Sequence, residues 1–516
     1  MDVHTKPADP APPPNYSHTQ ILRVISGIVL CMLLAALDQT AVVPAVPAIA
    51  RDLHSYGHVA WIVTAYLLTS TAVTPVFGKL SDTYGRRALL IPAIVIFIFA
   101  SILCAISQSL PELIVFRGLQ GIGGGGLLAM AQAAIADVVS PRERGRYQGY
   151  LAGTWAVASI AGPVIGGYVT DDLSWRWIFW FNLPLGLLAI YLCDRALRLF
   201  VVIPRHSRID VTGAVLLTGS ISALLVMLSW GGTEYSWVSA PVLLMGLLGL
   251  CLLGMLVWQE HRATDPLLPP RLFANTTFLC GVAVAFFASL GVFVGTFLLP
   301  LDFQFLYGYN AENSGLLIMP FLVANTVGAY VAGRLTRRFG KTKTIILLGL
   351  GSAAVGFLLL ATSGAGTSPV LIMSESIILG NGVGMCGPTA IVVVQNIVER
   401  RDLGVATGAF LLLRSMGGAF GSTIAGALLT VRFDDVLRAS GIYKTIGLGS
   451  LSQGKSGFVG LPADAHLIFI HALVGGFELA YFVSALLLLL SFLVALGLQD
   501  QTLKTSIAAE PPIAGH

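Results

Sequence analysis

The sequence carries little charge. Asp, Glu, Lys and Arg make up only 11% of its 516 residues, whereas soluble domains carry about 25%. Such a chain cannot cover a water-exposed surface. Its apolar residues, 55% of the total, fall in fourteen runs of about 20 residues, the length that a helix needs to cross a bilayer. We therefore expect an all-α polytopic protein with 14 transmembrane helices, located in the cell membrane (inner or plasma membrane).

Signals for cofactors and metals are also lacking. The six cysteines lie inside apolar runs without the spacing of metal ligands, so we expect them to pack in the interior. Gly121, Gly123 and Gly126 spell a dinucleotide-binding pattern, but no strand signal precedes them, and Leu335 replaces the first glycine of a phosphate-binding loop ending at 340–342. We expect no enzyme, cofactor or metal site. The net charge of +4 is spread over many loops, so we also expect no nucleic-acid partner.

The distribution of Lys and Arg predicts the orientation. If the N-terminus lies inside, most of the 30 basic residues fall in cytoplasmic loops, as the positive-inside rule requires. Both termini are then cytoplasmic, with a Pro-rich disordered tail at 1–20 and a second tail at 501–516. The longest external loop, 431–466, either folds as a lid or is flexible.

The sequence repeats itself. The segment GKLSDTYGRR at 78–87 returns as GRLTRRFGKT at 333–342, a shift of 255 residues. This shift superposes two blocks of six apolar runs and leaves one pair over. We therefore expect an N-terminal six-helix bundle at 21–200, an inserted two-helix hairpin at 201–262 and a C-terminal six-helix bundle at 263–500. Duplicated halves are how many secondary transporters build a central site that opens to either side.

Five motifs carry a family resemblance. They are the 78–87 loop, LIVFRGLQGIGGGG at 113–126, ASIAGPVIGG at 158–167, LDQTAVVPAVPAIARDL at 37–53 and WRWIFWFNLPLG at 175–186. Through them the chain resembles the major facilitator superfamily, specifically its drug:proton antiporter branch with fourteen spans. The resemblance implies the major facilitator fold, with two six-helix bundles and two inserted central helices.

The resemblance also assigns roles to two of these motifs. The 78–87 loop implies a cytoplasmic gate in which Asp82 pairs with basic groups, whereas the alternative is that Asp82 caps a helix. The other residues of this gate are Gly78, Gly85, Arg86, Arg87, Arg142 and Arg144. The fifth-span motif is associated with antiporters and implies a kinked, close helix contact through Gly162, Pro163, Gly166 and Gly167. Because Arg337 stands in the second loop copy where Asp82 stands in the first, any ion pair that closes the gate must differ between the halves.

Ionisable groups inside apolar runs are informative, since a charge in the bilayer costs about 2.5 to 3.5 kcal/mol and is kept mainly where it faces a cavity or a partner. Asp38 lies roughly 24 Å up the first run and Arg117 roughly 8 Å down the fourth, so the two can meet. An acid that is alternately buried beside a guanidinium and opened to water can bind and release a proton. Asp38 is therefore our candidate proton carrier, with a static ion pair as the alternative.

Further charges lie in the second half. We expect Glu375 and Glu478 to take part in proton coupling, although packing of Glu375 against Arg414 is an alternative. The candidates for the substrate pathway are Asp302, Gln304, Arg414 and, from the first half, Tyr66. Four acids against two arginines would make the pathway net negative, which favours a lipophilic cation as cargo.

Together these features predict a proton-coupled antiporter that exports small amphipathic compounds, cationic or lipophilic, by alternating access, as in multidrug efflux. Two alternatives remain. The same motifs serve an exporter of one dedicated metabolite such as an antibiotic or siderophore, and the fold could also belong to a non-transporting membrane sensor or scaffold. The expected partners are the small-molecule substrate, protons and the lipid bilayer, and we expect a monomer.

Overall fold

The computed structural model describes residues 18–499 except 55–58, 60, 199–209, 233, 310, 400–401 and 440–462, and it also describes residue 503. The helices in this part of the chain are α1 (His18–Asp52), α2 (Trp61–Tyr84), α3 (Arg86–Ile106), α4 (Leu110–Val138), α5 (Pro141–Asp172), α6 (Arg176–Trp180), α7 (Asn182–Leu197), α8 (Val211–Trp230), α9 (Ala240–Arg262), α10 (Pro270–Ala274), α11 (Thr276–Phe305), α12 (Ala311–Leu317), α13 (Met319–Phe339), α14 (Thr342–Thr362), α15 (Pro369–Ile397), α16 (Leu403–Ala439) and α17 (Ala463–Leu496).

The predicted fourteen spans are confirmed. The described residues contain 14 helical segments long and apolar enough to cross a membrane, with α6 and α7 forming one of them and the end of α12 joining α13 in another. Most of the expected tails, 1–20 and 501–516, lies outside the described residues, as does the 440–462 part of the expected external loop. Residues 431–439 and 463–466 of that loop continue α16 and α17.

Local sequence explains several helix starts. Ser109 accepts a hydrogen bond from the backbone N–H of Glu112, and Asp210 accepts one from Gly213. Asn275 accepts bonds from two backbone N–H groups in the first turn of α11. Each side chain satisfies donors that the first turn of a helix leaves unpaired, which is why short polar residues stand at these starts.

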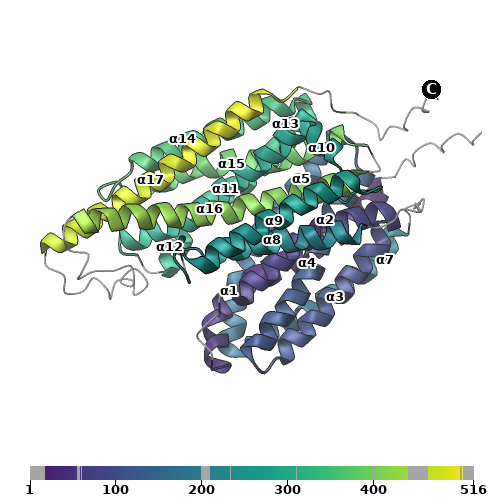
Figure 1. Cartoon of the computed structure of the whole chain (residues 1–516), viewed down its shortest axis with the longest axis horizontal. Helices are drawn as coiled ribbons and strands as arrows, with labels where there is room; N and C mark the ends of the chain where they lie inside the picture. The colour runs from purple at the N-terminus through teal and green to yellow at the C-terminus, as the bar shows by residue number, and fades with distance from the viewer. Residues whose placement is uncertain are drawn as a thin grey trace, which may run out of the picture.

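The helices form two bundles with a pair between them. Helices α1 to α7 enclose one set of apolar cores, and α11 to α17 enclose another. The inserted hairpin α8–α9 packs on both bundles, because Leu217, Ile221 and Leu256 cluster with Ala72 of α2 and with Leu412 of α16. Figure 1 shows the first bundle in purple and blue, the second in green and yellow, and α8–α9 in teal beside their junction.

Both copies of the repeated loop turn at a glycine with positive φ. Gly85 joins α2 to α3 with a φ of 92°, and Gly340 follows α13 with a φ of 68°. Positive φ values of this kind favour glycine, since a Cβ atom would collide with the backbone. The two turns differ in detail, because ψ is 151° at Gly85 and 3° at Gly340. The repeat therefore keeps the glycine of the turn but not its full backbone geometry.

The two bundles converge at one end only. We call the end that carries Tyr84, the last residue of α2, and Leu403, the first residue of α16, the motif end, and the opposite end the far end. In Figure 1 the bundles lie close together at the right, and α1, α3 and α4 diverge from α16 and α17 toward the left. Contacts between the halves are therefore concentrated near the motif end.

Candidate functional site

The predicted contact between Asp38 and Arg117 is present and wholly buried. The Arg117 Nη1 atom lies 2.6 Å from Asp38 Oδ2, and the two side chains are 1% and 0% exposed. Asp38 Oδ1 accepts hydrogen bonds from Gln120 Nε2 at 2.8 Å and from Asn182 Nδ2 at 2.7 Å. All three neighbours donate N–H groups, so the network fits an ionised carboxylate, which only accepts hydrogen bonds.

The rest of the network holds the guanidinium in place. Arg117 Nε donates to the carbonyl of Ile62 at 3.1 Å, and Nη1 donates to Gln120 Oε1 at 2.6 Å. The guanidinium carbon lies 4.5 Å from the ring centroid of Tyr66. Tyr66, an expected pathway residue, is therefore a buried neighbour of the ion pair. Five helices of the N-terminal half contribute to this cluster.

Sequence reasoning missed three members of the cluster. Gln120 lies three residues after Arg117, which places the two on one face of α4. Asn182 begins α7 within the 175–186 motif, and Ser101 accepts from both Gln120 and Asn182 at 2.6 and 3.2 Å. Their common signal is an uncharged polar side chain inside an apolar run.

The C-terminal half holds two acids without a basic partner. Asp302 is 3% exposed and accepts a hydrogen bond from the hydroxyl of Tyr481 at 3.3 Å. Glu375 is 5% exposed and accepts one from Ser363 Oγ at 2.8 Å. The two carboxylates lie close enough to interact electrostatically. Among the described residues neither forms an ion pair, so the alternative contact between Glu375 and Arg414 is not present in this structure.

The remaining candidates for the pathway and for proton coupling form no ion pair with these acids among the described residues. Gln304 donates a hydrogen bond to Ser314 Oγ at 2.9 Å. Glu478 is exposed on the stripe of α17 that also exposes Phe482 and Leu486, whereas Ala480 on the opposite face is buried in the core. Glu478 thus faces away from the C-terminal bundle. Arg414 is exposed on α16.

Asp82 links the two halves at the motif end. Its oxygens accept hydrogen bonds from the backbone N–H groups of Gly404 and Val405, each at 2.9 Å, at the start of α16. Arg86 Nη2 lies 2.7 Å from Asp82, and its Nε lies 2.7 Å from Asp137 Oδ2. The pairing and capping interpretations therefore meet in one residue, since Asp82 caps a helix of the opposite half while paired with Arg86.

The helices cross closely beside this cluster. A Cβ atom on Gly78 would lie 2.4 Å from the carbonyl oxygen of Gly404, so a side chain at position 78 would force α2 and α16 apart. Gly333 holds the position of Gly78 in the second copy of the loop. A Cβ atom on Gly333 would lie 2.1 Å from the carbonyl oxygen of Gly145, where α5 meets α13. Glycine is needed at both crossings because the backbones touch.

The second copy of the loop also contacts the other half, but there the loop supplies a basic residue and the other half supplies the acid. Arg337 Nη2 lies 3.1 Å from Glu143 Oε1 in the first turn of α5, with half-exposed side chains. Arg142 donates to the Arg337 carbonyl at 3.1 Å. Arg144 is buried and donates to the carbonyl of Gln395 of the other half at 3.1 Å, while Arg87 pairs with Asp194. Of the expected basic partners of Asp82, only Arg86 forms an ion pair with it among the described residues.

The fifth-span motif packs α5 on α1. A Cβ atom on Gly166 would lie 2.1 Å from the carbonyl oxygen of Ala41, and one on Gly162 would lie 2.0 Å from Thr40 Oγ1. Gly167 has open space beside it, and Pro163 is exposed. Two of the four motif residues therefore make the close helix contact, which lies one turn from Asp38 along α1.

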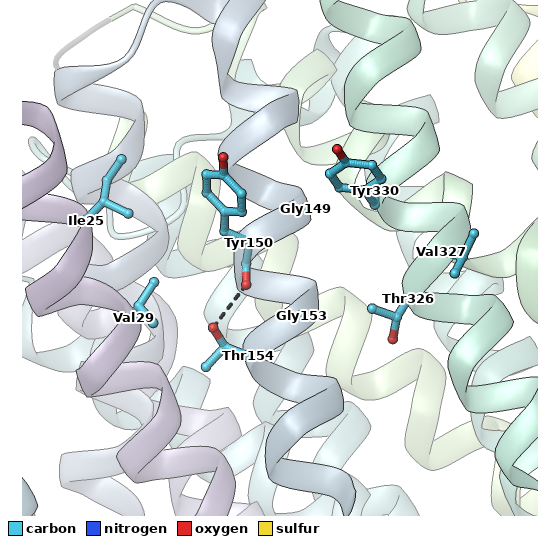
Figure 2. Close-up of a pocket in the computed structure, with 9 residues that line it drawn as sticks. All are labelled: Ile25, Val29, Gly149, Tyr150, Gly153, Thr154, Thr326, Val327 and Tyr330. Carbon is cyan, nitrogen blue, oxygen red and sulfur yellow. Dashed lines mark hydrogen bonds between the residues drawn. The ribbon is translucent and has the colours of Figure 1, made fainter. Parts of the chain in front are cut away.

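Two pockets lie between the halves near the motif end. Figure 2 shows a groove of about 570 Å³ between α1, α5 and α13, lined by Ile25, Val29, Gly149, Tyr150, Gly153, Thr154, Thr326, Val327 and Tyr330. A second pocket of about 380 Å³ lies beside Asp82. Its walls include Lys79, which pairs with Asp265, and Arg271, which pairs with Asp402 at 2.9 Å. The segment after α9 thus ties the inserted hairpin to the gate.

Two helix bundles that carry a repeated loop, joined at one end by ion pairs and hydrogen bonds, are typical of a polytopic membrane transporter. The family model described as Major Facilitator Superfamily matches residues 28–422, and the chain belongs to this family. It is a multi-pass membrane transporter and not an enzyme.

Relatives and solved structures agree. The chain is 36% identical over 420 residues to the multidrug transporter protein MdtP of Bacillus subtilis (strain 168), covering 80% of this chain and 76% of that protein. It is 31% identical over 434 residues to multidrug resistance protein 3 of the same organism, covering 83% of each. The crystal structure of the human organic anion transporter MFSD10 (TETRAN) matches at a TM-score of 0.61 and 16% identity, over 92% of this chain and 99% of that one. At this identity the structural match shows the fold alone.

Proposed function

We propose that the protein is a proton-coupled antiporter that exports small amphipathic compounds by alternating access. The observation that supports this most is the buried Asp38–Arg117 pair with its complete set of hydrogen-bond donors. Protonation of Asp38 would remove the negative charge that faces Arg117 and would turn a hydrogen-bond acceptor into a donor. The network would therefore have to rearrange. Binding of one proton would thus change the packing of helices α1, α4 and α7.

The second element of the proposal is the gate at the motif end, which we take to be the cytoplasmic end. The hydrogen bonds from Gly404 and Val405 to Asp82 hold the halves together there. In this state the bundles are apart at the far end, so the conformation is one closed to the cytoplasm. Breaking the gate and rocking the halves against each other would open the motif end and close the far end.

The connection between the pair and the gate runs through α4. This helix carries Arg117 and Gln120 near the far end and Asp137, the second partner of Arg86, at the motif end. A shift of α4 on protonation of Asp38 would therefore move a carboxylate that holds Arg86 beside Asp82. Protonation and gating are coupled in this scheme by one rigid helix.

Purified protein in liposomes with an imposed pH gradient tests the proposal. We expect gradient-driven movement of at least one dye from a panel that includes rhodamine 123 and fluorescein, with counter-movement of protons. Asp38→Asn preserves the side-chain size, so the protein should fold while coupled transport falls to background.

The matched control is Asp52→Asn on the same helix. Asp52 pairs with Arg176 near the end of α1 and lies outside the Asp38 cluster, so this variant should retain most of the transport. Undiminished proton coupling in Asp38→Asn would exclude Asp38 as the carrier, and transport insensitive to the pH gradient in the unmodified protein would exclude antiport.

A further inference from the structure

The charges deep in the membrane differ in what they face. Asp38, Arg117, Asp302 and Glu375 are all buried, each no more than 5% exposed. Among the six ionisable residues singled out within the spans, the two exposed ones are Arg414 and Glu478. Glu478 lies on the outer stripe of α17, so Arg414 is the exposed charge that remains to be explained.

Arg414 shares a face of α16 with Thr407. Thr407 precedes it by two helical turns on the same face, and Thr407 Oγ1 accepts a hydrogen bond from Gln395 Nε2 at 3.1 Å. Gln395 also donates to the carbonyl of Gln132 in the N-terminal half at 3.4 Å. The face of Thr407 is thus directed toward Gln395, whose amide contacts both halves.

The same face becomes accessible farther from the motif end. Thr407 is fully buried, whereas Arg414, about 10 Å farther along α16, is exposed. Arg414 is thus accessible at a level of α16 just beyond the contact made by Gln395.

No acid neutralises this guanidinium within the described residues. The ion pairs of the structure use other arginines, and the buried acids Asp302 and Glu375 are held by Tyr481 and Ser363 instead. An unpaired charge at this depth is costly and marks an ion or substrate pathway. A guanidinium favours carboxylate, sulfonate and phosphate groups, which it binds through paired N–H donors.

An aromatic surface lies beside the charge. The ring of Phe293 packs on Gly418, one turn beyond Arg414, and Phe293 is 48% exposed. Exposure also increases along α11, because Ser289 is buried whereas Phe293 and Thr296 are exposed. α16 thus presents an exposed cation about one turn from an exposed apolar ring, an arrangement that complements an amphipathic acid.

We propose that Arg414 binds an anionic group of the cargo, and that the exported compounds are therefore amphipathic organic anions. This rests on the proposed export function and names its substrate class. It reverses the expectation from the sequence, in which a net negative pathway favoured a lipophilic cation. The reversal follows from burial, since the acids that would have made the pathway negative do not face it.

Binding of two dyes to the detergent-purified full chain tests the assignment. Fluorescein and rhodamine 123 share a xanthene ring system but carry opposite charges, and fluorescence anisotropy reports the Kd of each. We expect Arg414→Gln to weaken fluorescein binding by about tenfold or more, Arg414→Lys to weaken it less, and rhodamine 123 binding to be unchanged or tighter in both variants.

The matched control is Arg432→Gln, which removes another exposed arginine from the same helix five turns away and should leave both Kd values unchanged. Equal fluorescein binding by the unmodified protein and Arg414→Gln, tighter binding of rhodamine 123 by the unmodified protein, or no fluorescein binding would overturn the proposal. The measurement needs no proton gradient. Arg414-dependent fluorescein binding without gradient-driven transport would therefore refute only the antiport mechanism, and coupled export without Arg414-dependent binding would refute only the substrate class.

Discussion

The two halves share a fold but arrange their charges in opposite ways. In the N-terminal half Asp38 and Arg117 face each other in a sealed network of donors and acceptors. In the C-terminal half the acids Asp302 and Glu375 lie among hydroxyl groups, and Arg414 is exposed on its own helix. Under the proposed function, proton exchange would take place in the N-terminal half and cargo recognition in the C-terminal half.

The gate shows a similar contrast between the halves. Asp82 is buried and accepts two backbone N–H groups across the interface. The equivalent contact of the second copy, Arg337 with Glu143, is an ion pair between half-exposed side chains. Equivalent positions of the repeat thus hold one strong and one weak lock.

The largest expected effect tests the contrast between the paired and the unpaired arginine. Arg117→Leu leaves the buried Asp38 charge without its partner, which costs about 3–5 kcal/mol of folding free energy. We expect a pronounced drop in the thermal unfolding temperature in detergent. Arg414→Leu is the control, because it breaks no ion pair in the described structure and should unfold near the temperature of the unmodified protein. Equal destabilisation by the two variants would show that the halves do not differ in this way.

The buried lock should give the next largest effect. Asp82→Asn replaces an ionised acceptor by an amide, which weakens the hydrogen bonds from the start of α16 and the pair with Arg86 by about 1–3 kcal/mol. Hydrogen–deuterium exchange should then rise about tenfold in the peptide containing Gly404 and Val405, with a parallel loss of transport. Unchanged exchange at this site would remove Asp82 from the gate.

The exposed lock should give the smallest effect. Glu143→Gln removes the partner of Arg337, and ion pairs between exposed groups contribute less than about 1 kcal/mol. Exchange at the start of α5 should rise by less than about fivefold, and transport should persist. A loss as large as that of Asp82→Asn would mean that the two locks are equivalent, contrary to their difference in burial.

Much of the site was predictable from single residues. The meeting of Asp38 and Arg117 followed from the direction and rise of two helices, and the pair lies 2.6 Å apart. The close approach at Gly78 and the pairing of Asp82 with Arg86 followed from the loop motif and are also present. What could not be predicted is which face a charge occupies, because positions such as 414 and 478 have no motif to fix the helix rotation.

The sequence by itself determined the fourteen spans, the duplication and the buried ion pair, because hydrophobic length, a repeated loop and the cost of a charge in lipid act locally along the chain. Only the tertiary structure decided that Asp82 caps a helix of the opposite half, that Glu478 faces outward and that Arg414 is exposed. These facts depend on how each helix is rotated and which helix it meets. Packing between segments hundreds of residues apart sets both.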